Sequence, residues 1–249
     1  MKSVPGTLLD GGASFQTTHW TIVLQAGRTE PDRSAQQALA AFCEAYWLPL
    51  YAFLRHRRYT REDAQDLVQA FFAHLLAQNA LSRADREKGR LRTFLLGSLQ
   101  NFLSNEYDRV HALKRGGGHK IVSFDEHFPE AEAVMLSTAH LDEVSCYDLS
   151  WASNVVARAW QQLRATFAEE GKAEWFDELK PFLAGGTAAP PNQDEVAARM
   201  KVPVATLRTW ISRLRQRYRE ALRAEVASTV SDPAEIDGEL RYLYRLLTE

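Results

Sequence analysis

The chain has 249 residues, of which 45% are hydrophobic and 25% are charged, and this composition is ordinary for a soluble globular protein. It contains no apolar run of membrane length, and residues 1–15 lack a charged-then-apolar signal, so we expect a cytoplasmic protein with no membrane partner. Cys43 and Cys146 belong to no paired motif, which argues against a disulfide framework or a zinc site. We interpret both as small buried hydrophobic residues.

The formal net charge of −2 is unevenly distributed along the chain. Residues 121–150 contain seven acidic residues and no Lys or Arg, so the remainder carries a net charge of +5. Local charge, rather than the total, decides whether a surface attracts nucleic acid. The overall acidity therefore does not exclude a nucleic-acid-binding protein.

Residues 16–112 are predicted to form a bundle of about four helices, because apolar residues recur at helical spacing and no strand-like alternation of useful length occurs. The first helix is expected to begin at Thr18 and to stop at Gly27. In the third helix, Asp63, Asp66 and Gln69 are expected to point outward. The apolar residues expected to face the core are Trp20, Val23 and Leu24; Leu39, Phe42, Tyr46 and Leu50; Leu67, Phe71, Leu75 and Leu76; and Phe94, Leu95, Leu99, Phe102 and Leu103.

Residues 113–150 are predicted to connect two domains. They begin with a basic, glycine-rich hinge, whose three consecutive glycines disfavour regular structure and whose cations include Lys114 and Arg115. The acidic residues 121–150 follow as a linker.

Residues 151–226 are predicted to form a second all-helical domain, ending in two helices joined by a tight turn. A short helix is expected to begin near Asp194, whose side chain would cap it, and to end at Lys201, Val202 and Pro203 because the residue before a proline is disfavoured in helical geometry. The apolar faces before it are Trp151, Val155, Val156, Ala159, Leu163 and Phe167, and then Trp175, Phe176, Leu179 and Phe182.

The last helix of this domain has an apolar stripe on one side and arginines on the other, with no acid between Val204 and Arg219. Two helices joined by a tight turn, the second one cationic, form the geometry that lays a helix in the major groove of DNA. An arginine-rich face that is only solvated is the alternative. Because base-reading residues usually lie toward the helix N-terminus, we expect Arg208, Thr209, Ser212, Arg213 and Gln216 to contact bases and Arg215, Arg217 and Arg219 to contact phosphates.

Residues 231–249 are predicted to form a C-terminal helix that Asp232 caps. Ile236, Leu240, Leu243 and Leu247 would form one apolar stripe. We expect this helix to pack on a domain of the chain or to bind a partner, because it would otherwise expose that stripe.

The sequence ATLRTWISRLRQRYREAL, residues 205–222, resembles the recognition helix of region four of bacterial sigma factors. The match rests on Thr206, Leu207, Arg208 and Arg213, and it implies that Thr206 also belongs to the DNA-binding helix. Lys201 stands where this family usually has a turn glycine, so a conserved turn geometry would require a positive φ at this lysine.

Two further stretches resemble region two of sigma factors. Residues 63–72 match the helix that docks on the clamp of the polymerase, and this resemblance implies docking through Asp63, Asp66, Gln69 and Phe72. Residues 90–109 are similar to the part that melts and reads the promoter, although Glu106 and Asp108 dilute its positive charge. The alternative that Phe94 and Phe102 are core residues stays open. With the hinge cations, the implied DNA-binding set is Arg90, Arg92, Phe94, Asn101, Asn105, Arg109, Lys114 and Arg115.

The two blocks, in this order and with a linker between them, resemble an extracytoplasmic-function-type sigma factor of a subgroup with extended N- and C-terminal ends. The resemblance implies two small helical domains and a non-enzymatic subunit that binds core RNA polymerase through its clamp and flap, recognises promoter DNA and needs no cofactor or metal. An anti-sigma factor is a further partner that the sequence does not specify. The alternative is a helix-turn-helix regulator that does not bind polymerase. An enzyme is disfavoured, because the seven histidines show no metal spacing and no nucleophile motif is present.

Overall fold

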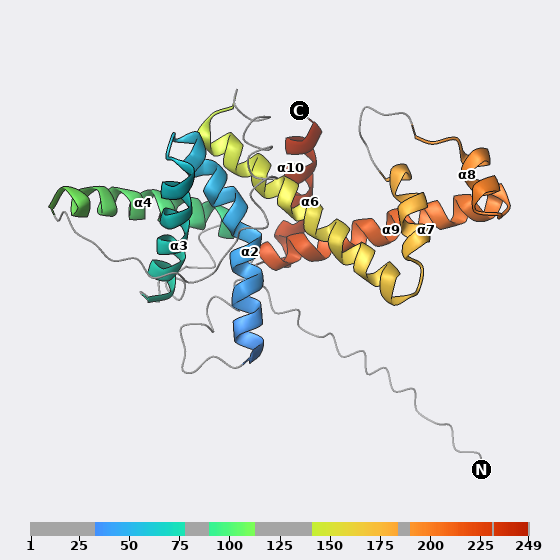
Figure 1. Ribbon diagram of the computed structural model, residues 1–249, viewed down its shortest axis with the longest axis horizontal. Helices are drawn as coiled ribbons and strands as arrows, with labels where there is room; N and C mark the ends of the chain where they lie inside the picture. The colour runs from blue at the N-terminus through green and yellow to red at the C-terminus, as the bar shows by residue number, and fades with distance from the viewer. Residues whose placement is uncertain (1–32, 78–89, 113–140, 184–189, 231, 249) are drawn as a thin grey trace, which may run out of the picture.

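The computed structural model describes residues 33–77, 90–112, 141–183, 190–230 and 232–248, and every regular element within these ranges is a helix (Figure 1). The expected all-α class is therefore confirmed. The helix expected at Thr18 and the hinge that contains Lys114 and Arg115 lie outside the described residues. The elements are α2 (Arg33–His56), α3 (Arg61–Ala77), α4 (Leu91–Ala112), α6 (Glu143–Glu169), α7 (Ala173–Leu179), the 3₁₀ turn η4 (Lys180–Phe182), α8 (Gln193–Arg199), α9 (Val204–Thr229), the 3₁₀ turn η5 (Pro233–Glu235) and α10 (Ile236–Thr248).

A first hydrophobic core lies among α2, α3 and α4 and is rich in aromatic side chains. Phe42 lies edge-on to Phe72 at 5.9 Å between ring centroids, and Phe71 lies 5.7 Å from Phe102. Such aromatic pairs stabilise a core beyond the area that they bury. The predicted apolar stripes are largely confirmed, with full burial of Phe42, Tyr46, Leu50, Phe71, Leu75, Leu95, Leu99, Phe102 and Leu103 and partial burial of Leu39, Leu67, Leu76 and Phe94.

The helix α2 contains Pro49 and continues through it to His56. A proline cannot donate a backbone hydrogen bond, so the carbonyl of Ala45, four residues earlier, loses its helical partner. The side-chain amide of Asn154 in α6 replaces that partner and donates to Ala45 O at 2.7 Å. This bond ties α2 to α6 at the place where the α2 hydrogen-bond ladder is interrupted.

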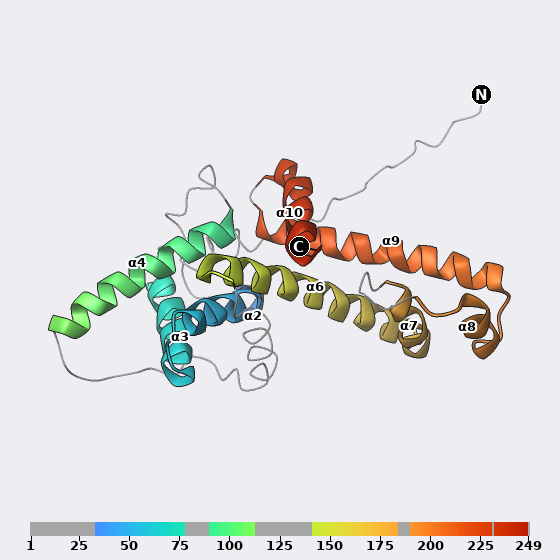
Figure 2. The same cartoon turned by 90° about the horizontal axis from the view of Figure 1, so that it is seen from above.

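The long helices α6 and α9 run side by side in opposite directions, from the part of the molecule near α10 toward α7 and α8 (Figure 2). Trp151 and Val155 of α6 and Val226 of α9 join the first core, whereas Leu163 of α6 and Leu207 of α9 join a second one. An ion pair between Arg158 and Glu225 at 2.9 Å links the two helices. They therefore belong to both cores.

This arrangement corrects the predicted linker and domain boundary. The linker was expected to extend over residues 113–150, but residues 143–150 form the first two turns of α6. Cys146 and Tyr147 are fully buried there, so this part of the acidic segment is core rather than spacer. The predicted boundary at Trp151 consequently falls inside a continuous helix.

The second core lies between the distal half of α6, the short helices α7 and α8, and the first half of α9. Phe167 and Phe176 pack at 5.5 Å between centroids, and Trp160 packs against Tyr218 at 5.2 Å. Of the predicted second apolar face, Phe176, Leu179 and Phe182 are buried, whereas Trp175 remains 40% exposed.

The C-terminal helix α10 packs on α6 and α9, which confirms the expectation that it contacts the rest of the chain. Ile236 and Leu243 enter the first core, while Leu247 of the predicted stripe is 42% exposed. Asp232 accepts a hydrogen bond from Ala234 N at 2.8 Å, so the predicted cap is present at the turn before α10. Among the described helices, none is long and apolar enough to cross a membrane.

Candidate nucleic-acid interface

The pair α8 and α9 forms a helix-turn-helix whose ends are defined by backbone hydrogen bonds. Asn192, rather than the expected Asp194, caps α8, because its side chain accepts from Asp194 N at 2.9 Å. Two bonds then close the C-terminal turn: Lys201 N donates to Ala198 O and Val202 N donates to Ala197 O. This pattern is a Schellman motif, which requires a left-handed residue after the helix. Lys201 takes that role with φ of 55°, the positive value that a tight turn at this position was expected to require.

The α9 helix turns one face inward and leaves its cations on the other side. Leu207, Ile211 and Leu214 are buried at the helical spacing of three and four residues. Most of the predicted DNA-contacting residues lie outside this stripe: Arg208, Thr209, Ser212, Arg213, Arg215 and Gln216 are exposed, and Thr206 and Arg217 are half-buried.

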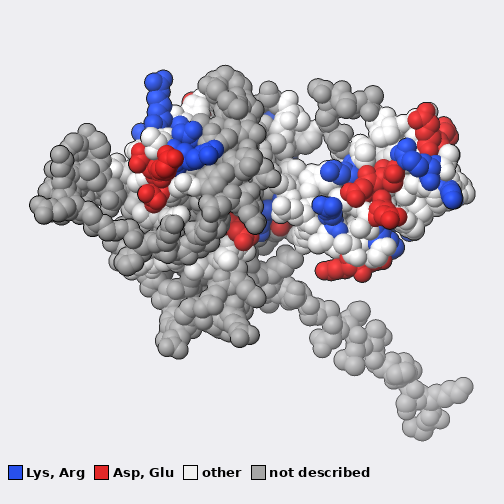
Figure 3. Space-filling model, viewed as in Figure 1, with Lys and Arg blue, Asp and Glu red and all other residues white. Residues whose placement is uncertain are grey.

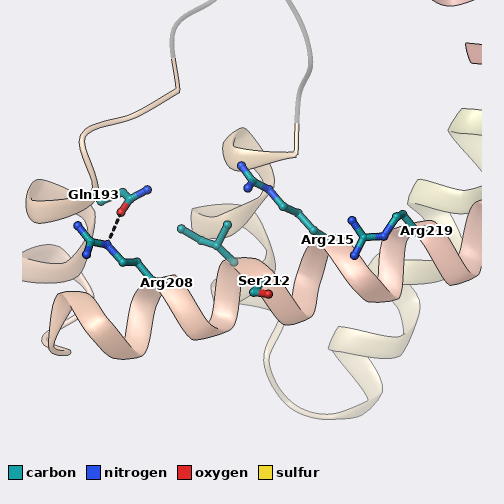
Figure 4. Close-up of a pocket in the computed structure, with 6 residues that line it drawn as sticks. Gln193, Arg208, Ser212, Arg215 and Arg219 are labelled. Carbon is teal, nitrogen blue, oxygen red and sulfur yellow. Dashed lines mark hydrogen bonds between the residues drawn. The ribbon is translucent and has the colours of Figure 1, made fainter.

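One flank of α9 forms an arginine-lined hollow of about 330 Å³ beside Gln193 of α8 (Figure 4). Arg208, Arg215 and Arg219 recur here at spacings of seven and four residues, and Ser212 lies between them. Arg208 Nε donates to Gln193 Oε1 at 2.9 Å, and Arg215 Nη2 donates to the Phe182 carbonyl at 3.2 Å. Both acceptors are neutral, so the hollow keeps its positive charge. Guanidinium groups in such a row match the oxygens of a phosphate backbone.

The opposite flank of α9 carries an aromatic stack of one exposed and one half-buried tryptophan. Trp210 of α9 and Trp175 of α7 lie 4.3 Å apart between ring centroids with an interplanar angle of 18°. Arg217 also lies here; it pairs with Glu170 at 2.9 Å and covers the Phe167 ring at 5.2 Å. Glu170 also pairs with Lys172 at 2.8 Å, so its charge is shared between two cations. Because its guanidinium is already held by this carboxylate, Arg217 is less available to phosphate than Arg215 or Arg219.

Charges of both signs are mixed over the lobe formed by α7, α8 and the start of α9 in the view of Figure 3. Part of the acid there is internally paired, since Glu178 holds Arg199 through two hydrogen bonds of 2.9 and 2.7 Å. This face of the lobe therefore does not present a uniformly positive surface.

Arg92 was predicted to contact DNA, and this prediction is wrong. Its side chain is 8% exposed and is held by Asp148 of α6 at 2.5 Å and by Glu239 of α10 at 3.4 Å. Burial alone lowers the pKa of an arginine, but these two carboxylates outweigh the burial and raise the pKa of Arg92. A guanidinium that is enclosed and neutralised in this way cannot reach a phosphate.

The other predicted residues of α4 are divided between core and surface. Phe94 packs partly against the first core, and Phe102 is buried, so the core alternative holds for Phe102. Asn101 and Asn105 are exposed. Arg90, just before α4, is half-buried and forms an ion pair with Glu239. The side chain of Arg109 lies outside the described residues, as do Lys114 and Arg115.

The predicted docking surface on α3 is only partly exposed. Asp63 and Asp66 are exposed, and Gln69 is half-buried. Asp63 also accepts a hydrogen bond from the Thr60 hydroxyl at 2.8 Å, at the N-terminus of the helix. Phe72, however, is 6% exposed and packs against Phe42. Its assignment to a docking surface is therefore wrong, since the ring belongs to the core.

The described residues thus define an all-helical protein with a helix-turn-helix that presents a row of arginines. No family model, curated protein or solved structure matches the chain. Within the described part of the chain, no group of three or more His, Cys, Asp and Glu side chains is placed to hold a metal ion.

Proposed function

We propose that the protein is an RNA polymerase sigma subunit of the extracytoplasmic-function type, which binds core polymerase, recognises promoter DNA and supports initiation in the cytoplasm. The observation that carries this proposal is the helix-turn-helix of α8 and α9, whose second helix exposes arginines beside an open hollow. The region-two-like bundle with its acidic α3 face supports the same assignment, because a DNA-binding module alone has no use for that face.

In this proposal different residues along the recognition helix contact bases and phosphates. Arg208, Thr209 and Ser212 of the first turns contact base edges together with Arg213 and Gln216, and each bidentate arginine contact discriminates by about 1–3 kcal/mol. Arg215 and Arg219 hold phosphates from the same flank. Asn101 and Asn105 of α4 contact the second promoter element, and Asp63, Asp66 and Gln69 contact the polymerase clamp.

A second candidate is a helix-turn-helix regulator that does not bind polymerase. The burial of Phe72 and Arg92 favours it, because two residues that the sigma resemblance assigns to partners are used inside the fold. In this candidate function α9 still contacts DNA, but α3 does not contact polymerase.

Binding of core polymerase distinguishes the two candidates. The full chain is mixed with purified core enzyme, the affinity is measured, and transcription from a genomic DNA library is sequenced. We expect binding and selective initiation from the wild-type protein. Asp66→Ala with Gln69→Ala should weaken binding by about tenfold, which corresponds to about 1.4 kcal/mol. Glu174→Ala, which removes an exposed acid of α7, serves as the control and should bind normally.

If the wild-type chain binds DNA but binds neither core polymerase nor the isolated polymerase clamp, the sigma assignment fails. The helix-turn-helix regulator is then the supported function. If the α3 variant binds core enzyme as tightly as the wild type, the proposed docking surface is wrong even if the protein supports initiation.

A further inference from the structure

Glu239 of the C-terminal helix α10 lies between two arginines that precede or begin α4. Its side chain is 1% exposed, and it forms ion pairs with Arg90 and with Arg92. A carboxylate enclosed to this degree is tolerated in a protein only when it is paired. Glu239 is therefore committed to these two cations in the free protein.

The two arginines differ in the contacts that they make besides the ion pair with Glu239. Arg92 has a second carboxylate, Asp148, and its guanidinium lies 4.9 Å from the Trp151 ring and 4.3 Å from the Tyr242 ring. Tyr242 also donates to Asp148 at 2.6 Å, which fixes this corner of the network. Arg90 has Glu239 as its ion-pair partner, lies 5.9 Å from the Tyr242 ring, and keeps a side chain that is 37% exposed.

Arg90 immediately precedes α4 and is half-buried, whereas Arg92 lies in its first turn and is buried. At 100° per residue, the helical positions of Phe94, Asn101 and Asn105 fall within about 60° of that of Arg90, whereas the position of Arg92 lies about 160° away. Arg90 therefore continues the polar stripe of Asn101 and Asn105, and Arg92 continues the buried stripe of Leu95 and Leu99.

We propose that Glu239 is an intramolecular competitor for DNA: it occupies the guanidinium of Arg90, which DNA phosphate must capture to use the full α4 stripe. The inference rests on the proposed contact between α4 and DNA. An arginine fork fits carboxylate and phosphate oxygens in the same way, so the exchange requires no change of fold. After the exchange Glu239 remains paired with Arg92, and no buried charge is left alone.

The test uses Glu239→Gln, which keeps the shape of the side chain and removes its charge. Binding of the full chain to a fluorescein-labelled 30-base-pair duplex and to a mixed-sequence 20-base single strand is measured by anisotropy at 50–200 mM KCl. One additional phosphate contact steepens the slope of log affinity against log salt by about 0.9. We therefore expect tighter binding than for the wild type, with an advantage that falls about 3.5-fold between 50 and 200 mM salt.

The controls separate this effect from a change in net charge or in folding. Glu44→Gln makes the same charge change at an exposed carboxylate of α2 that has no ion pair within the described ranges, and it should leave the slope unchanged. Arg90→Ala should cancel the gain when it is combined with Glu239→Gln. If the Glu239→Gln protein unfolds at a lower temperature than the wild type, Glu239→Asp is used instead. This substitution retains the charge but withdraws it from Arg90, and it should give an intermediate gain in DNA affinity.

A folded Glu239→Gln or Glu239→Asp protein with wild-type affinity and slope overturns the inference. For the unmodified protein, we expect saturating DNA to shift the Nε–H resonance of Arg90 and to leave that of Arg92 in place; an unchanged Arg90 resonance also overturns it. Failure of the proposed function gives a different result. In that case none of these variants binds DNA, or the affinity for DNA does not change in the Arg208→Ala and Arg213→Ala proteins.

Discussion

At the scale of single residues, the structure stores backbone strain at helix C-termini. Arg58, Gly171 and Lys201 all have positive φ values, of 65°, 69° and 55° respectively. Each follows a helix, and each closes the same pair of hydrogen bonds back to the last turn. Glycine adopts this conformation without a penalty, whereas a side chain costs about 1–2 kcal/mol. Two of the three positions therefore carry a cost that the packing of α2, α8 and α9 offsets.

Replacing Lys201 by glycine should stabilise the protein. We expect the free energy of unfolding to rise by about 1 kcal/mol, because the substitution removes the left-handed strain and leaves both turn hydrogen bonds intact. For a chain of this size the melting temperature should rise by about 2–4 °C. Thermal denaturation followed by circular dichroism measures the change.

Gly171→Ala is the matched control at the end of α6, with the opposite sign. No atom lies within 4 Å of a Cβ built on Gly171, so the loss of stability reports the backbone conformation alone. Equal melting temperatures for the wild-type and Lys201→Gly proteins would show that the lysine is not strained, or that its side chain contributes a compensating contact.

At the scale of elements, one exchanged hydrogen bond contributes to the junction of α2 and α6. The Ala45 carbonyl cannot bond to residue 49 because that residue is proline, and Asn154 of α6 supplies the donor instead. A buried carbonyl without a donor costs about 1–3 kcal/mol. Asn154→Ala should therefore lower the free energy of unfolding by that amount, measured by urea denaturation.

A double-mutant cycle tests the cause. Pro49→Ala restores a backbone N–H that bonds to Ala45 O within α2, so the loss from Asn154→Ala should shrink in the Pro49→Ala background. Additive losses would mean that Asn154 stabilises the junction by packing rather than by satisfying this carbonyl.

The apolar stripes of the helices could be predicted because helical periodicity is a local property of the sequence. The same periodicity also held an unused signal: Arg92 precedes Leu95 by three residues and Leu99 by seven, which places it on the buried face. Phe72 likewise lies four residues after Val68 and three before Leu75, both buried. In both cases the helical spacing indicates the observed burial, whereas the family resemblance implies an exposed contact residue.

Other features could not be predicted from local patterns. The pairing of Arg92 with Glu239 joins residues 147 positions apart, and no spacing rule reaches so far. The start of α6 lies within the acidic segment, whose charge favours a linker over a buried helix. Its buried residues Cys146, Tyr147 and Ser150 recur at the helical spacing of three and four, and this was the available signal.

At the scale of the whole molecule, α6 and α9 hold the helix-turn-helix and α4 toward opposite ends (Figures 1 and 2). α9 has 26 residues and is therefore about 39 Å long at 1.5 Å per residue. Its first half packs in the second core, and Val226 near its end packs in the first core. The exposed face of α9 is thus fixed relative to the bundle that carries α3 and α4, and in the proposed function this arrangement suits contacts with two separate DNA elements.

This fixed geometry leads to a prediction for the holoenzyme that separates base-reading arginines from phosphate-holding ones. Arg208→Ala or Arg213→Ala should cost about 1–3 kcal/mol and relax the preference at one base pair of the promoter. Arg219→Ala should weaken binding to all promoter sequences alike and reduce the slope of log affinity against log salt by about one. The reason is that its guanidinium lies in the hollow away from the helix N-terminus. Arg217→Ala is the matched control, since Glu170 already holds that guanidinium in an ion pair, and its effect on the slope should be smaller. Promoter selection is measured by sequencing transcripts from a randomised promoter library with each reconstituted holoenzyme. Unchanged promoter preference and initiation rate in both the Arg208→Ala and Arg213→Ala enzymes would show that α9 is not the reading helix.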